Sequence, residues 1–92
     1  MKTININIMQ VEDRKNEYLA YFKSDFLKAT FALYFNDNIL GSVALASFSE
    51  MIRYKYDVKK IEYVITSKKL KFKNPALLDV LSNNGNTLKL AG

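Results

Sequence analysis

Near the N-terminus the chain reads KTININIMQV (residues 2–11), with isoleucine at every second position from Ile4 to Ile8. Alternation of β-branched and polar residues is the period of a strand that buries one face and leaves the other in water. The stretch therefore predicts a strand with its isoleucines in the core. Residues 12–16 are polar and predict a turn after it.

Two further stretches alternate in the same way and predict strands. Residues 17–23 also carry aromatic side chains at helical spacing, but the alternation of Leu19 and Tyr21 favours a strand. Residues 27–35 place Leu27, Phe31 and Phe35 on one face. Polar residues 36–38 then suit a hairpin turn. We expect a return strand over residues 39–46, with a bulge at Gly41.

The next part of the chain predicts a helix followed by two more strands. Ser47 and Glu50 fit a capping box, in which serine bonds forward and glutamate reaches back, so a helix is expected from there to about residue 57. Residues 59–66 alternate clearly and predict a strand. Residues 67–68 suit a tight turn, and residues 69–73 predict a strand with Leu70 and Phe72 facing inward.

The C-terminal part predicts a second helix. Asn74 and Pro75 are a strong helix start, because asparagine caps the free N–H groups and proline loses no useful donor. Residues 83–85 would end this helix in a left-handed cap. Residues 87–90 would form a short final strand. The expected fold class is α+β: a mainly antiparallel sheet in the order ββββ-α-ββ-α, with two helices packed on one face.

Composition limits both the architecture and the chemistry. Ninety-two residues, 49% of them hydrophobic, predict a single compact domain spanning residues 1–92. The chain has no cysteine and no histidine. This excludes disulfides, thiolate or imidazole metal sites and histidine-dependent catalysis. We expect no catalytic residue, no metal and no cofactor. No signal peptide or membrane span is recognisable, so a cytoplasmic location is expected.

The net charge of +5 is unevenly distributed. Residues 1–50 carry five basic and six acidic side chains, whereas residues 51–92 carry nine basic and three acidic ones. Two tyrosines lie among the cations, and exposed aromatics among cations are typical of surfaces that bind single-stranded nucleic acid. The predicted anion-binding residues are Arg53, Tyr54, Lys55, Tyr56, Lys59, Lys60, Lys68, Lys69, Lys71 and Lys73.

A simpler interpretation of these lysines stays open. Lysine is common on exposed strand faces and protects edge strands from aggregation. The chain has twelve lysines and nine asparagines but only two arginines, a composition that an A/T-rich gene would also produce. Few arginines argue against base-specific recognition, so any nucleic-acid contact is expected to be to phosphates and weak.

Three functions follow as hypotheses. The first is a non-catalytic protein that binds an anionic partner, such as RNA, DNA or a nucleoprotein, through residues 53–73. The second is a small inhibitor of phage or plasmid type that blocks a host nucleic-acid-processing complex by protein–protein contact. The third is a ribonuclease toxin that cuts RNA without histidine. Free sheet edges would also permit a dimer through an edge strand, although no apolar surface stripe is recognisable. No membrane partner is expected.

Overall fold

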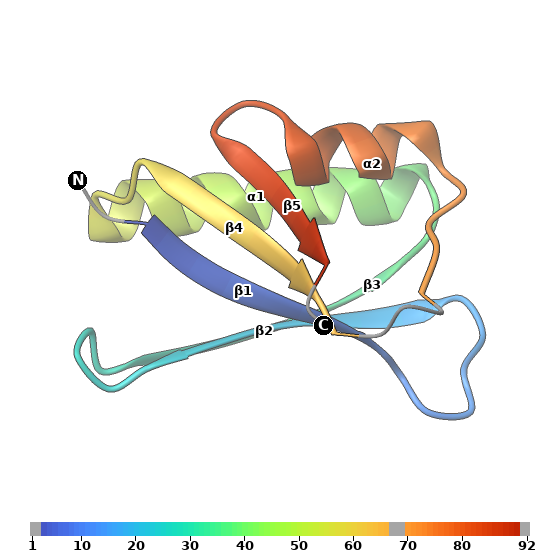
Figure 1. Cartoon of the computed structure of the whole chain (residues 1–92), viewed down its shortest axis with the longest axis horizontal. Coiled ribbons are helices and arrows are strands. Elements are labelled where there is room, and N and C mark those ends of the chain that lie inside the picture. Colours follow the sequence, from blue (N-terminus) through green and yellow to red (C-terminus); the bar gives the residue numbers. More distant parts are fainter. Residues whose placement is uncertain (1–2, 67–69, 91–92) are drawn as a thin grey trace.

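The computed structural model describes residues 3–66 and 70–90, which form one five-stranded sheet and two helices (Figure 1). Neither of these helices has the length and apolar character that a membrane crossing requires. In chain order the elements are β1 (Thr3–Gln10), β2 (Glu17–Ser24), β3 (Ala29–Asn36), α1 (Ile39–Tyr56), β4 (Lys60–Ile65), α2 (Pro75–Ser82) and β5 (Asn86–Leu90).

The sheet is mixed, with the strand order β3-β2-β1-β4-β5. Strands β1, β2 and β3 form an antiparallel meander, whereas β4 is parallel to β1 and β5 is parallel to β4. The α+β class predicted from sequence is therefore confirmed. The predicted element order and the mainly antiparallel sheet are wrong in detail, because α1 and α2 each return the chain for a parallel strand.

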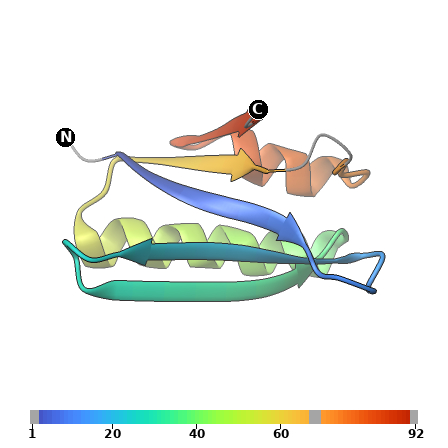
Figure 2. The same ribbon diagram turned by 60° about the horizontal axis from the view of Figure 1, so that its bottom comes forward.

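The core lies between one face of the sheet and the two helices. Ile4, Ile6 and Ile8 of β1 are buried, while the residues between them are exposed, as the alternation predicted. The same alternation recurs in β2 and β4. The helices contact each other, α1 also contacts β3, and α2 contacts β5. Figure 2 shows the strong twist of the sheet around them.

The predicted hairpin at residues 36–38 and return strand at residues 39–46 are wrong, because α1 begins at Ile39. Asn38 is the helix cap, and its side chain accepts a hydrogen bond from the Gly41 N–H at 2.7 Å. The expected capping box is wrong for the same reason. Ser47 lies exposed in the middle of α1, and Glu50 forms an ion pair with Arg53.

Gly41 marks a close approach between the start of α1 and the end of β3, not a bulge. A Cβ atom on Gly41 would lie 1.8 Å from the backbone oxygen of Asn36. The chain can therefore turn from β3 into α1 over so few residues only because this position has no side chain.

The predicted strand over residues 69–73 is also wrong for the described residues 70–73, which are irregular. Leu70 and Phe72 are nevertheless buried, so the inward alternation holds. The N–H groups of Lys73 and Asn74 donate to the carboxylate of Asp37, at 2.7 and 3.0 Å, instead of to a neighbouring strand. This segment thus crosses the end of the sheet and leads into α2. The turn predicted at residues 67–68 lies outside the described residues.

The second helix and the final strand form as predicted. The Asn74 side chain caps α2, with Pro75 at its first position. After α2, Asn84 and Gly85 take positive φ values of 58° and 87°, which turn the chain into β5. The predicted left-handed cap is wrong, because the cap residue Asn83 is extended; the two positive-φ residues instead form a tight turn closed by a hydrogen bond from the Asn86 N–H to the Asn83 carbonyl oxygen at 3.1 Å.

Candidate interaction surfaces

Six of the ten predicted anion-binding residues lie together where α1 ends and β4 begins. Lys55, Lys59 and Lys60 are exposed there, and the ring of Tyr54 is 93% exposed. Arg53 and Tyr56 are half-buried. We name the group the basic end; it consists of Arg53, Tyr54, Lys55, Tyr56, Lys59 and Lys60.

The other predicted residues are not at the basic end. Lys71 and Lys73 are exposed, but the Lys73 backbone is bonded to Asp37, directly before α1. An 18-residue helix is about 27 Å long, so nearly the whole of α1 separates these lysines from Lys55. Figure 1 shows the segment before α2 at the opposite end of α1 from the start of β4. Lys68 and Lys69 lie outside the described residues.

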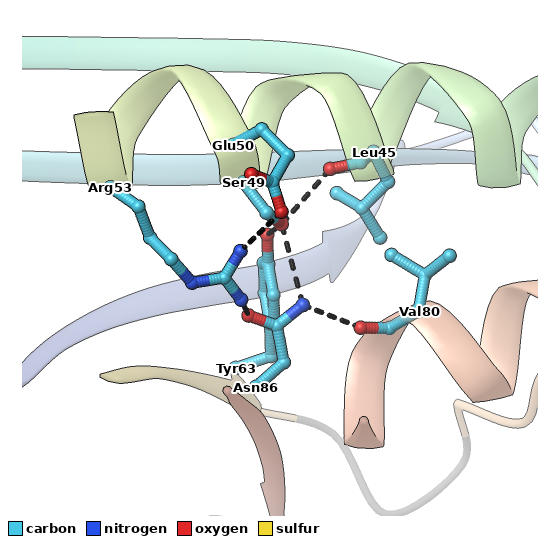
Figure 3. Close-up of polar contacts among 7 residues, drawn as sticks. All are labelled: Leu45, Ser49, Glu50, Arg53, Tyr63, Val80 and Asn86. Carbon is cyan, nitrogen blue, oxygen red and sulfur yellow. Dashed lines mark hydrogen bonds and ion pairs between the residues drawn. The ribbon is translucent and has the colours of Figure 1, made fainter. Parts of the chain in front are cut away.

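Within the basic end, two cationic side chains already have partners. Arg53 forms an ion pair with Glu50 at 3.0 Å and donates a hydrogen bond to the Asn86 side chain (Figure 3). The Lys55 ammonium lies over the rings of Phe31 and Tyr56, 5.9 and 5.6 Å from their centroids. The least engaged cations at this end are therefore Lys59 and Lys60.

Acidic residues also reduce the positive charge of the basic end. Asp57 is exposed between Lys55 and Lys59, and Glu62 is half-buried two residues after Lys60. Residues 53–73 contain eight basic and two acidic side chains. Lys71 and Lys73 lie at the far end of α1, and the two acids lie among the residues of the basic end. Among the residues that the structure describes, the predicted set is therefore not gathered into one strongly positive patch.

A buried polar network joins α1 to β4 and β5 (Figure 3). The hydroxyl groups of Ser49 and Tyr63 share a hydrogen bond, and Ser49 also donates to the Leu45 carbonyl oxygen at 3.0 Å. Asn86 donates to the Val80 carbonyl oxygen at 2.6 Å. Sequence reasoning missed this network, since a lone serine, tyrosine and asparagine on three elements give no local signal.

Burial raises the pKa of Tyr63 to about 12, although the hydrogen bond with Ser49 and the charge of Arg53 act in the opposite direction. The ordinary value is 10.0, so between pH 10 and pH 12 the unfolded chain loses a proton that the folded chain keeps. The contribution of Tyr63 to stability is therefore complete below pH 10 and declines above it.

We expect this decline to total roughly 3 kcal/mol, at about 1.4 kcal/mol per pH unit. Urea unfolding between pH 8 and pH 12 would measure it, with Tyr63→Phe as the reference. The wild-type advantage over Tyr63→Phe should shrink as the pH approaches 12. Two curves that stay parallel over this range would contradict the assignment.

The outer side of α1 is apolar to an extent that the sequence prediction did not anticipate. The residues of its first half, from Ile39 to Phe48, include no charged side chain. Leu40 is 79% exposed, Ile39 66% and Val43 58%. Side chains of this size and kind are ordinarily scattered on a protein surface, and several together mark a contact site.

A shallow groove lies at the junction of β3 and α1. Its lining residues come from the last part of β3, the cap of α1 and the first turns of α1, with one acidic residue from β2: Glu17, Tyr34, Phe35, Asn36, Asn38, Leu40, Gly41 and Ala44. We name the combination of this groove, the exposed apolar side chains of α1 and the outer edge of β3 the α1–β3 surface.

Comparison with protein-family models, with curated proteins and with solved structures finds no match to this chain.

Proposed function

We propose that the chain is a non-catalytic binding protein that works by protein–protein contact through the α1–β3 surface. The observation that carries the proposal is the exposure of Ile39, Leu40 and Val43 on α1, with Leu40 lining the groove beside β3. Complete burial of one such aliphatic side chain favours association by roughly 1.5–3 kcal/mol. An inhibitor of a nucleic-acid-processing complex, the second function expected from sequence, is one form of this activity.

The outer edge of β3 supports a polypeptide partner. Among the described residues no strand pairs with that edge, so its backbone N–H and C=O groups are free to bond. Exposed edge strands are ordinarily protected by lysine, proline or a bulge, and the eight residues of β3 include neither lysine nor proline. An edge that is free and uncharged is suited to pairing with another strand.

Binding of an anionic partner is a second candidate function, now limited to the basic end. The exposed ring of Tyr54 beside Lys55, together with Lys59 and Lys60, favours it. If these three lysines contact phosphates, the logarithm of the association constant should fall against the logarithm of salt concentration with a slope of about −2 to −3. Apolar contact through the α1–β3 surface would depend on salt far less.

One capture experiment separates the two candidates. The immobilised chain would be exposed to a nuclease-treated extract of the cells that encode it, at low and high salt. Wild type is compared with the double variant Leu40→Asp/Val43→Asp, the double variant Lys59→Glu/Lys60→Glu, and Leu90→Asp. Leu90 is the matched control, since its 66% exposure lies between those of Leu40 and Val43, but it belongs to β5 at the opposite edge of the sheet.

The proposal predicts a specific protein that persists at high salt, is retained by the lysine and Leu90 variants, and is lost by the α1 variant. Circular dichroism would confirm that each variant is folded. Loss in the lysine variant alone, with binding of a generic oligonucleotide that weakens steeply with salt, would favour the anionic partner instead.

A further inference from the structure

We infer that the polypeptide on the α1–β3 surface is a second copy of this chain, paired antiparallel through β3 in a twofold dimer. The inference rests on the proposed function, because it takes this surface to be a protein contact, and it adds the identity of the occupant. In such a dimer the two five-stranded sheets join into one of ten strands.

The edge of β3 is complementary to itself. An antiparallel pair of identical strands satisfies the free backbone groups of both copies, and a twofold axis uses the same patch twice. The strand is eight residues long and uncharged along its whole length, so no like charges would oppose each other across the joint.

The flank of α1 beside β3 is also suited to a symmetric contact. Leu40, Ala44, Ser47 and Met51 are spaced by four, three and four residues, which places them on one side of the helix. Leu40 and Ala44 line the groove together with β3 residues, so this side faces the edge. Met51 is still 40% exposed.

Pairing the two β3 strands would bring the two helices together. Each α1 contacts its own β3, and paired strands lie about 4.8 Å apart. The two α1 helices would therefore become antiparallel neighbours on the same face of the joined sheet. Small side chains allow helix axes to approach to about 8–10 Å, and the middle of the flank is formed by Ala44 and Ser47, with Leu40 and Met51 toward its ends.

The distribution of charge favours a second copy at this place. Two copies of a chain with a net charge of +5 repel each other. Self-association is therefore favoured at a surface that carries few cations. The first half of α1 and the whole of β3 carry no charged side chain, and Lys55, whose ammonium lies over Phe31, stands at the C-terminal end of this flank. The other free edge of the sheet, β5, carries Lys89.

Cysteine cross-linking tests the geometry directly, because the natural chain has no cysteine. Thr30, Ala32 and Tyr34 are exposed on the same face of β3. In an antiparallel pair, residues directly opposite each other have Cα atoms about 4.5–5.5 Å apart, within the range that a disulfide spans. We would prepare Thr30→Cys, Ala32→Cys and Tyr34→Cys, with Thr87→Cys on β5 as the matched exposed control.

We expect rapid disulfide dimers from one of the β3 variants alone, or from two of them mixed, whichever places cysteines opposite each other across the axis. The Thr87→Cys chain should stay monomeric under the same oxidation. Equal cross-linking of all variants would indicate random collision and would overturn the inference.

Sedimentation equilibrium supplies the second measurement. Wild type and Leu90→Asp should approach twice the chain mass of 10.6 kDa at micromolar concentration, and Leu40→Asp should raise the dissociation constant at least tenfold. A wild type that stays monomeric to millimolar concentration, with no β3 cross-link, would overturn the dimer.

If the wild type were monomeric but Leu40→Asp/Val43→Asp still lost its captured partner, the proposed function would stand without the dimer. If the dimer formed and capture of other proteins did not depend on Leu40, the inference would stand and the surface would serve self-association only.

Discussion

Replacing Gly41 with alanine is expected to destabilise the protein by at least ~3 kcal/mol, although the same change usually stabilises the interior of a helix by about 1 kcal/mol. The added Cβ would lie 1.8 Å from the Asn36 backbone oxygen. The clash is between the new Cβ atom and a backbone oxygen, and no flexible side chain can move aside to remove it. The connection between β3 and α1 would have to shift.

Urea unfolding monitored by circular dichroism would measure this loss, with Ser47→Ala as the control. Ser47 is exposed in the middle of the same helix, and alanine there should add a few tenths of a kcal/mol through helix propensity. A Gly41→Ala protein as stable as the wild type would mean that the connection relaxes without cost.

Replacing Asn86 with alanine is the second change with a large expected effect, a loss of roughly 3 kcal/mol. The Asn86 side chain is buried, accepts a hydrogen bond from Arg53 and donates to the Val80 carbonyl oxygen. Its removal leaves the Val80 carbonyl oxygen and one N–H group of Arg53 without these partners, although Arg53 keeps its ion pair with Glu50. Each group left unsatisfied costs about 1–3 kcal/mol.

The matched control is Thr87→Ala, one residue further along β5, because Thr87 is exposed. It should change the free energy of unfolding by less than about 0.5 kcal/mol. Asn86→Asp keeps the acceptor for Arg53 but loses the donor to Val80, so an intermediate loss is expected. A loss below 1 kcal/mol for Asn86→Ala would show that α2 and Arg53 rearrange around the gap.

Most of the strands were predictable because each buries one face. The isoleucines of β1, and Ile61, Tyr63 and Ile65 of β4, follow the period of two without interruption. The start of α2 was predictable from the chemistry of asparagine and proline at its first positions. These signals are local, so neighbours in sequence were sufficient to recognise them.

Helix α1 was missed over its first half because its buried side is made partly of small and polar residues. The buried residues at helical spacing include Leu45 and Ile52, but also the small or polar Gly41, Ser42 and Ser49. A pattern based on large apolar residues does not include these three. Apolar residues also lie on its exposed side. Together these features resemble an irregular strand, so the sequence did not predict the apolar flank of α1 beside β3.

The basic surface could not be predicted for a different reason. Lys55 and Lys73 lie 18 positions apart in a segment dense in lysine, but the chain between them forms β4 and then crosses the end of the sheet. Only the three-dimensional path separates them by the length of α1. The polar network around Asn86 likewise joins residues 37 positions apart.

The central position of β1 has a consequence for synthesis on the ribosome. Strand β1 can pair with β2 as soon as both have emerged, but its other neighbour, β4, follows only after α1 has been made. A nascent chain that has emerged from the ribosome only as far as residue 57 therefore exposes the unpaired edge of β1 in addition to that of β3. Slow translation between α1 and β4 would lengthen the time during which this intermediate can aggregate.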